Sequence, residues 1–129
     1  MKGNRKMEKV YTKNAPEAIG PYSQAMKVGN LVFTSGQIAI DPVTGNVEAT
    51  DVVGQAEQVC KNLCAVLEAA GTSIEKAVKT TCFLADMADF AAFNEVYGKY
   101  FVGKPARSCV AAKQLPKNVL CEVEVIAEL

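Results

Sequence analysis

Residues 51–70 carry apolar side chains at intervals of three and four, the spacing of one face of an α-helix. Thr50 or Asp51 can cap the start, because a short polar side chain accepts a hydrogen bond from a free backbone N–H there. Gly71 suits the C-terminal end, where a left-handed conformation is common. The pattern predicts a long helix that lies with one face on a sheet, and the apolar positions are Val52, Val53, Ala56, Val59, Cys60, Leu63, Val66, Leu67 and Ala70.

Alternation of apolar and polar residues, together with β-branched side chains, predicts strands on either side of this helix. After a short extended piece near the letters KVYT, the segment SQAMKVGNLVFTSG is typical of a hairpin. Gly29 and Asn30 would supply the positive backbone angles that its two-residue turn demands. Beyond the helix, the letters AVKTTCFL at 77–84 predict a further strand.

A second helix is predicted over residues 86–101, with Asp86 or Asp89 near its start. Gly98 lies inside this segment and lowers the helix propensity of the last turn. The residues expected to pack against the sheet form one helical stripe, made of Phe90, Phe93, Val96, Tyr97 and Tyr100.

Two predicted strands, 106–110 and 120–127, close the chain. In the first, alternation places Arg107 and Cys109 on one face. In the second, two glutamates lie opposite an apolar face formed by Cys121, Val123, Val125 and Ala127.

The element order β-β-α-β-α-β-β predicts an α+β fold in a single domain, residues 8–129, with both helices packed on one face of a mixed sheet. The other face of the sheet carries polar groups and must meet water or another subunit. The basic start of the chain, MKGNRKMEK, is expected to form a flexible tail or expression leftover over residues 1–7, with Met7 as the natural start.

The overall composition is globular, with half of the residues hydrophobic and a formal net charge of zero. Zero net charge argues against a nucleic-acid partner, because that affinity rests on clustered Lys and Arg. No apolar run approaches the roughly 18 residues of a membrane helix, and no secretory signal is visible. The five cysteines are odd in number and lie mostly in apolar patterns, so we expect reduced thiols in a cytoplasmic protein.

The chain contains no histidine, which excludes a Ser-His-Asp or Cys-His nucleophile within it. Acid–base chemistry would have to use Glu, Asp, Lys, Tyr, Cys or a water held by the backbone. Cys60 and Cys64 are four residues apart, but without histidine or a second cysteine pair they are poor zinc ligands, and no metal is expected. Neither GxGxxG nor GxxxxGK[ST] occurs, so no phosphate loop is predicted.

Arg107 follows Pro105 by two residues at the start of a strand, where a guanidinium can hold a carboxylate through two parallel hydrogen bonds. The alternative is a solvated arginine or an ion pair with Glu122 or Glu124. Cys109 shares the face of Arg107, and a nearby guanidinium would lower the pKa of its thiol. The alternative for Cys109 is a small, half-buried side chain.

Glu122 could hold a water or move a proton if its face of the sheet is buried at an interface, and would do nothing special if exposed. Gly36, after Ser35 at a strand end, would let a ligand approach backbone N–H groups closely. Gly20 and the proline after it form a rigid turn that presents Tyr22, an aromatic wall with a hydroxyl. Both glycine segments fit plain turn chemistry equally well.

Four segments resemble, in order and spacing, the RidA/YjgF family of reactive-intermediate deaminases: NAPEAIGPYSQA, FTSGQIAIDPVTG, AGTSIEKAVKTTCFLADMADFAAFNEVYGKYF and PARSCVAAKQLPKNVLCEVEVIA. The resemblance covers nearly all of residues 8–129, and the block PARS…LP…E.E.IA is a specific signature of the family. It implies a chorismate-mutase-like fold and a homotrimer packed through its sheets, with three clefts between subunits.

The resemblance also implies an enzyme, a 2-iminobutanoate/2-iminopropanoate deaminase, which is a hydrolase acting on C=N bonds without a cofactor. Such an enzyme converts 2-imino acids and their enamine tautomers, such as 2-aminoacrylate, to 2-oxo acids and ammonia. These reactive intermediates leak from pyridoxal-phosphate enzymes and damage other enzymes of that class. The implied role is therefore protective.

By the same resemblance, Arg107 would bind the substrate carboxylate, and Glu122 would position or activate the attacking water. Backbone groups at Cys109 and Gly36 would hold the imine end and the water. Because an imine is already electrophilic, the protein mainly needs orientation, a dry pocket and one held water.

Three further residues complete the implied site. Tyr22 would close the pocket from the neighbouring subunit, and Ser35 and Asn94 would support it as polar groups. The chain departs from the family pattern at the connection 101–105, which is shorter than in many relatives and is expected to reshape the cleft rim and the preference among imino-acid side chains. Cys121 replaces the usual aliphatic residue, where only a packing change is expected.

Two rival functions remain open. One is a non-catalytic trimer that binds or senses small 2-oxo acids, against which the presence of both Arg107 and Glu122 counts. The other is an RNA-directed endoribonuclease or translation inhibitor, against which zero net charge, missing histidine and the lack of a basic–aromatic stripe count.

Overall fold

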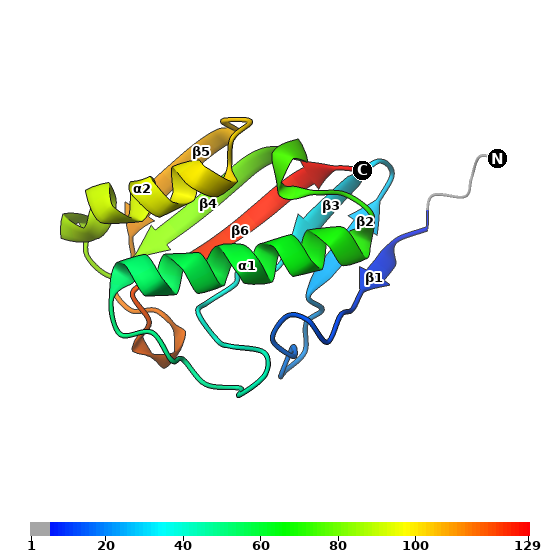
Figure 1. Ribbon diagram of the computed structural model, residues 1–129. Coiled ribbons are helices and arrows are strands. Elements are labelled where there is room, and N and C mark those ends of the chain that lie inside the picture. Colours follow the sequence, from blue (N-terminus) through cyan, green and yellow to red (C-terminus); the bar gives the residue numbers. More distant parts are fainter. Residues whose placement is uncertain (1–5) are drawn as a thin grey trace.

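The structure, a computed structural model, describes residues 6–129 and contains one six-stranded sheet with two helices lying across it (Figure 1). Residues 1–5 of the expected tail lie outside the described residues. The elements are β1 (Glu8–Val10), β2 (Ala25–Val28), β3 (Leu31–Thr34), α1 (Val52–Ala70), η1 (Ile74–Lys76), β4 (Ala77–Leu84), η2 (Met87–Asp89), α2 (Phe90–Tyr100), β5 (Ala106–Ala111), η3 (Pro116–Asn118) and β6 (Cys121–Glu128).

The sheet is mixed, as predicted, with strand order β1-β2-β3-β6-β4-β5. Only β4 and β5 pair in parallel, and the other neighbours are antiparallel. A parallel pair needs a crossover, which α2 supplies on the same face of the sheet as α1 (Figure 1). The expected α+β fold with both helices on one face is therefore confirmed.

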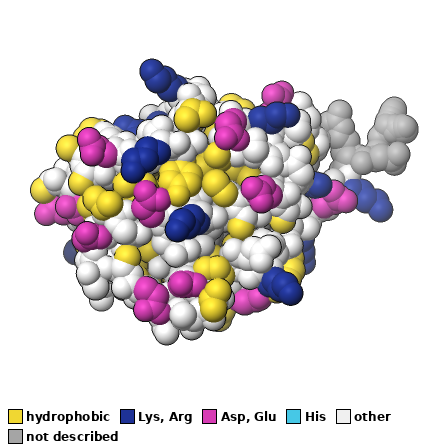
Figure 2. Space-filling model, viewed as in Figure 1, with side chains coloured by type: hydrophobic (Ala, Val, Ile, Leu, Met, Phe, Trp, Pro, Cys, Tyr) yellow, Lys and Arg dark blue, Asp and Glu magenta, His cyan; other side chains and the backbone are white. Residues whose placement is uncertain are grey.

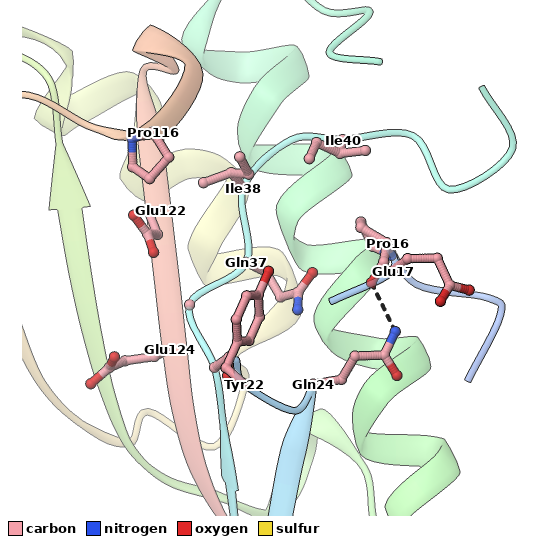
Figure 3. A pocket seen from close by; sticks show the side chains of 12 residues that line it. Pro16, Glu17, Tyr22, Gln24, Gln37, Ile38, Ile40, Pro116, Glu122 and Glu124 are labelled. Atoms are coloured by element: carbon pink, nitrogen blue, oxygen red, sulfur yellow. Dashed lines mark hydrogen bonds between the residues drawn. The ribbon is translucent and has the colours of Figure 1, made fainter. Parts of the chain in front are cut away.

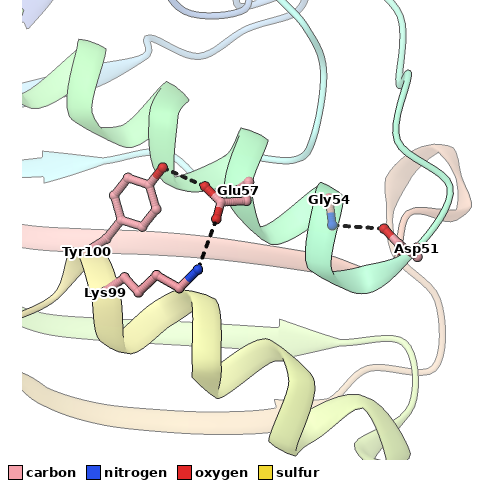
Figure 4. Close-up of polar contacts among 5 residues, drawn as sticks. All are labelled: Asp51, Gly54, Glu57, Lys99 and Tyr100. Atoms are coloured by element: carbon pink, nitrogen blue, oxygen red, sulfur yellow. Dashed lines mark hydrogen bonds and ion pairs between the residues drawn. The ribbon is translucent and has the colours of Figure 1, made fainter.

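Helix α1 has the predicted ends. The Asp51 side chain accepts a hydrogen bond from the Gly54 N–H at 2.9 Å (Figure 4), and Gly71 terminates the helix at a φ of +94°. Its buried face carries most of the predicted apolar positions, although Val53 is 44% exposed. The same face also buries Gln55 and Asn62.

Helix α2 begins later than predicted, because a 3₁₀ turn at Met87–Asp89 precedes it and the Asp86 side chain caps that turn instead. Gly98 does not interrupt the helix, which runs to Tyr100. A Tyr100–Glu57 hydrogen bond of 2.7 Å and a Lys99–Glu57 ion pair of 3.7 Å join α2 to α1 (Figure 4).

The hairpin of β2 and β3 forms at Gly29 and Asn30, as predicted. Only Gly29 has a positive φ, of +60°, so the expectation of positive angles at both residues is wrong. A type II′ turn requires a positive φ only at its first central residue, which explains how the turn closes. The extended piece near KVYT contributes β1, which pairs with β2.

The register of the sheet separates two faces. Thr80 and Cys82 of β4 are buried on the face that the helices cover, and the Thr80 hydroxyl contacts the Tyr97 hydroxyl of α2 at 2.7 Å. Neighbouring residues of β4, such as Phe83, lie on the open face. On that open face, Phe33, Phe83 and Ile126 lie among the glutamates of β6. The open face is therefore partly apolar, and neither α1 nor α2 covers it.

None of the helices in residues 6–129 combines the length and the apolar character needed to cross a bilayer. On the face in Figure 2, acidic and basic side chains are interspersed rather than gathered by sign. The cytoplasmic location stays a prediction.

Candidate functional site

The Glu122 cavity lies against the open side of the sheet, where β6 meets the loop after β3 (Figure 3). It has a volume of about 560 Å³. Three of its lining side chains are acidic, and none is Lys or Arg. The lining residues are Pro16, Glu17, Tyr22, Gln24, Ser35, Gly36, Gln37, Ile38, Ile40, Pro116, Glu122 and Glu124.

Glu122 occupies the space that a side chain at Gly36 would fill. A Cβ at Gly36 would come within 2.9 Å of the Glu122 carboxyl carbon and would collide with its oxygen. Burial is the first cause that raises the pKa of Glu122, and the neighbouring Glu124 is the second. A carboxylate with a raised pKa accepts and returns a proton more readily near neutral pH.

Tyr22 and Ser35 form part of the wall beside this carboxylate. The Tyr22 N–H donates to the Gly20 carbonyl at 2.9 Å across Pro21, which confirms the tight turn, and the residue Tyr22 is 53% exposed. The Ser35 hydroxyl donates to the Ser23 carbonyl at 2.6 Å, so it ties this wall together. The two segments are therefore fixed to each other beside the cavity.

Two buried amides hold the loops of this cavity and were missed in the sequence. Asn62 of α1 donates to the carbonyls of Ile38 and Ile40 at 3.1 and 2.9 Å. Gln24 accepts from the Thr12 N–H at 2.7 Å and donates to the Pro16 carbonyl at 2.8 Å (Figure 3). An asparagine within the apolar stripe of a helix is the signal that could have found Asn62, because a buried amide requires partners.

The Arg107 cavity lies between α2 and the start of β5 and measures about 490 Å³. Its two charged lining residues, Lys104 and Arg107, are both basic. The Arg107 guanidinium donates to the Asn94 side-chain oxygen at 2.7 Å. The lining residues are Asn94, Tyr97, Gly98, Phe101, Val102, Lys104, Pro105 and Arg107.

Two aromatic rings of α2 support the guanidinium. Its central carbon lies 4.8 Å from the centre of the Tyr97 ring and 5.4 Å from that of Phe90. Cation–π contacts and the Asn94 bond fix its plane while leaving further N–H donors for a ligand. The ion pairs found in residues 6–129 are Lys27–Glu8 and Lys99–Glu57, so the alternative of a pair between Arg107 and a β6 glutamate is wrong.

Cys109 lies on the same face as Arg107 and beside Cys82 of β4, as strand alternation predicts. It is a free, partly buried thiol. Burial raises its pKa, and the guanidinium of Arg107, which lowers it, does not offset that effect. The lowering effect of Arg107 is present, as expected, but burial outweighs it, and the interpretation as a small half-buried side chain is favoured.

The structure divides the predicted site residues between the two faces of the sheet. Arg107 pairs with Thr80 in the β4–β5 register, on the helix-covered face, and Asn94 reaches it from α2. Glu122 pairs with Phe83 on the open face, together with Tyr22, Ser35 and Gly36. Within one chain, Arg107 and Glu122 are not brought together. In residues 6–129 no group of three His, Cys, Asp or Glu side chains could hold a metal ion.

Comparison with known proteins accounts for nearly the whole chain. Residues 12–129 match the profile of the family described as endoribonuclease L-PSP. A RutC family protein of Pyrococcus horikoshii is 53% identical over 121 residues, which cover 93% of this chain and 96% of the relative.

Solved structures show the same fold. The E. coli YjgF gene product is 46% identical with a TM-score of 0.90, over 94% of this chain and 98% of that one. E. coli TdcF, solved with bound serine, is 44% identical with a TM-score of 0.90, over 95% of this chain and 98% of that one. The chain therefore belongs to the endoribonuclease L-PSP family, which is the YjgF/RidA family.

Proposed function

We propose that this protein hydrolyses 2-imino acids and their enamine tautomers, such as 2-iminobutanoate and 2-iminopropanoate, to 2-oxo acids and ammonia. The observation that carries the proposal is the pairing of an anchored guanidinium in one cavity with a partly buried carboxylate of raised pKa in the other. Removal of such imines would protect the pyridoxal-phosphate enzymes that they damage.

Arg107 binds the substrate carboxylate in this proposal. It is the only arginine in residues 6–129, and Asn94, Phe90 and Tyr97 hold its guanidinium group, which has the shape of a fork, in place. A preoriented fork loses little side-chain entropy on binding. A charge-assisted contact contributes about 1.5–3 kcal/mol, a large share of the binding energy for so small a substrate.

Glu122 moves the protons. Its carboxylate takes a proton from water as the water oxygen bonds to the imine carbon, and the C=N double bond becomes a C–N single bond. The same carboxyl group passes that proton to nitrogen, which gives an intermediate with a hydroxyl and an amino group on one carbon. It then takes the hydroxyl proton as the C=O bond forms and delivers it to nitrogen as the C–N bond breaks, so the products are ammonia and a 2-oxo acid. Backbone groups at Gly36 and Cys109 orient the water and the imine, and Tyr22 closes the pocket with Ser35 as support.

The two cavities must come from different copies of the chain for these groups to meet. One cavity is lined by acidic residues without a base, and the other by basic residues without an acid, so the two attract each other. The open face carries Phe33 and Val110, which are 40% and 50% exposed. We propose a homotrimer packed through its open faces, with three sites between neighbouring subunits.

A second candidate function is small-ligand binding without turnover, since the relative TdcF was solved with bound serine, a small amino acid. Glu122 distinguishes the two functions, because binding of a carboxylate does not require it. An RNA-directed activity has less support, because the Glu122 cavity offers three acidic side chains and no base to a phosphate backbone.

The decisive experiment generates 2-iminobutanoate with threonine dehydratase and measures its loss with and without the protein. Wild type should accelerate the loss, Arg107→Ala should abolish the acceleration, and Glu122→Gln should reduce it strongly. Glu128→Gln is the matched control, because Glu128 is an exposed residue of the same strand outside the cavity. Equal rates for wild type and Arg107→Ala would refute the site, and no acceleration by wild type would favour the binding function.

A further inference from the structure

Building on the proposed function, we propose that Lys104 and Arg107 together select imino acids with a second carboxylate on the side chain. Both residues line the Arg107 cavity, and no acidic residue does. Arg107 takes the carboxylate next to the imine, and Lys104 takes the distal one. The substrate class is therefore the dicarboxylic 2-imino acids.

The position of Lys104 is set by a short, anchored turn. Its N–H donates to the Phe101 carbonyl at 3.1 Å, and Phe101 itself is buried. Lys104 has a φ of +53°, in the left-handed region that non-glycine residues rarely adopt. Pro105 follows directly and fixes the backbone into β5. The side chain of Lys104 therefore starts from a fixed backbone position, three residues before Arg107.

Gly103 anchors the same turn from the other side. A Cβ at this position would lie 3.0 Å from the Glu75 carbonyl oxygen, so the backbone packs closely against the end of η1. Because the connection between α2 and β5 is short and packed at both ends, Lys104 stays at the cavity. A longer connection would allow that charge to move away.

The charge of Lys104 is available to a ligand. The ion pairs of residues 6–129 do not include Lys104, and the nearest charged neighbour in the cavity lining is another cation, Arg107. Three residues of extended chain span about 10 Å, and the flexible four-carbon stem of lysine can shorten the gap to a small dicarboxylate. Two cations around one cavity favour a dianion over a monoanion.

The test compares two imines under one assay. The monocarboxylic imine is 2-iminobutanoate, and the dicarboxylic one is 2-iminoglutarate, produced from glutamate by an amino-acid oxidase. For wild type, Lys104→Gln and Lys104→Glu, kcat/KM is measured with both. We expect Lys104→Gln to lower kcat/KM for the dicarboxylic imine roughly five- to tenfold and for the monocarboxylic imine less than about twofold, with a larger selective loss in Lys104→Glu.

Lys117→Gln is the matched control, because Lys117 also has a positive φ, of +56°, and lines neither cavity. It should leave both rates unchanged. Equal losses on both imines in Lys104→Gln, or a change in oligomeric state by sedimentation, would overturn the proposal, since Lys104 would then serve docking between subunits. Activity on the monocarboxylic imine without a selective effect would overturn only this proposal.

A binding measurement separates this proposal from the proposed catalysis. By calorimetry, the stable product 2-oxoglutarate should bind wild type more tightly than 2-oxobutanoate, and Lys104→Gln should remove that preference. This result without any imine hydrolysis would refute the deaminase and keep the dicarboxylate site. Equal affinity of wild type for both 2-oxo acids would refute the dicarboxylate site.

Discussion

The Arg107 cavity and the Glu122 cavity hold their key side chains in opposite ways. Side chains fix Arg107, through the amide of Asn94 and two aromatic rings of α2. Glu122, by contrast, lies against backbone, because Gly36 carries no side chain. The Asn62 side chain fixes the loop that follows Gly36 by donating to the backbone carbonyls of that loop. A cage of side chains suits a cation that must bind in one orientation, whereas bare backbone beside a carboxylate leaves space for a water. The two proposed roles, carboxylate binding and proton transfer, therefore depend on different structural features of the chain.

Apart from removal of Arg107 or Glu122 itself, the largest effect is expected from filling the space under Glu122. Gly36→Ala places a methyl group where the Glu122 carboxylate lies, so the carboxylate must move. Because displacement by about 1 Å can cost on the order of 100-fold in rate, we expect a kcat loss of that size. The circular dichroism spectrum should stay unchanged, since the displaced group is the far end of a side chain. Wild-type kcat in Gly36→Ala would contradict the role of Glu122.

A smaller effect is expected from loosening Arg107. Asn94→Ala removes the acceptor that orients the guanidinium, and should raise KM roughly tenfold, with a smaller change in kcat. Asn94→Asp keeps an acceptor but adds a negative charge that competes with the substrate carboxylate. Its KM should therefore also rise, and an unchanged KM in both variants would show that Arg107 needs no positioning.

The raised pKa of Glu122 makes a prediction about stability. The folded chain binds this proton more tightly than the unfolded chain, so ionised Glu122 destabilises the fold. The free energy of unfolding therefore falls as pH rises through the pKa of Glu122 in the unfolded chain and then through its raised pKa in the folded chain. Below both pKa values, Glu122 is protonated in both states and this loss of stability is absent. Glu122→Gln should therefore raise Tm at pH 7, and the gain should vanish below about pH 4. Thermal scans at both pH values test this, and an equal gain in Glu128→Gln would contradict it.

The smallest effect is expected from replacing Gly98, which lines the Arg107 cavity, in contrast to Gly36 of the Glu122 cavity. A Cβ at Gly98 in α2 would meet no atom within 4 Å, unlike one at Gly36. Gly98→Ala should therefore raise the free energy of unfolding by about 0.5–1 kcal/mol, because alanine favours the helix. Urea denaturation measures this, and destabilisation would show that the helix needs the glycine.

Local patterns were sufficient to predict most of the fold. Asp51 and Gly71 end α1 where expected, and the strand at 77–84 matches β4 residue for residue. Of the two aspartates expected near the start of α2, Asp89 is the N-cap residue of the helix, and Asp86 caps a separate 3₁₀ turn that the predicted helix had included. The positive φ expected at Asn30 was wrong, because a Gly-Asn pair fits either of two turn types and only one of them requires a positive φ at the second residue.

The candidate site was less predictable, because its geometry depends on which face of the sheet each strand presents. Alternation correctly put Arg107 with Cys109, but no local pattern relates the face of β5 to that of β6. That relation follows from β4, which pairs with both strands. For Cys109, the sequence shows the neighbouring charge of Arg107 but not the burial, a tertiary property, that outweighs it and raises the pKa of the thiol.

The central claim is that Arg107 and Glu122 of different copies form one site. Arg107→Ala and Glu122→Gln, each inactive or nearly so, can be unfolded together, refolded as a mixture and assayed with 2-iminobutanoate. In a random mixture, a site between neighbours contains both wild-type residues in about one case in four, so about a quarter of wild-type activity should return. A mixture that stays at the level of the separate variants would contradict the account.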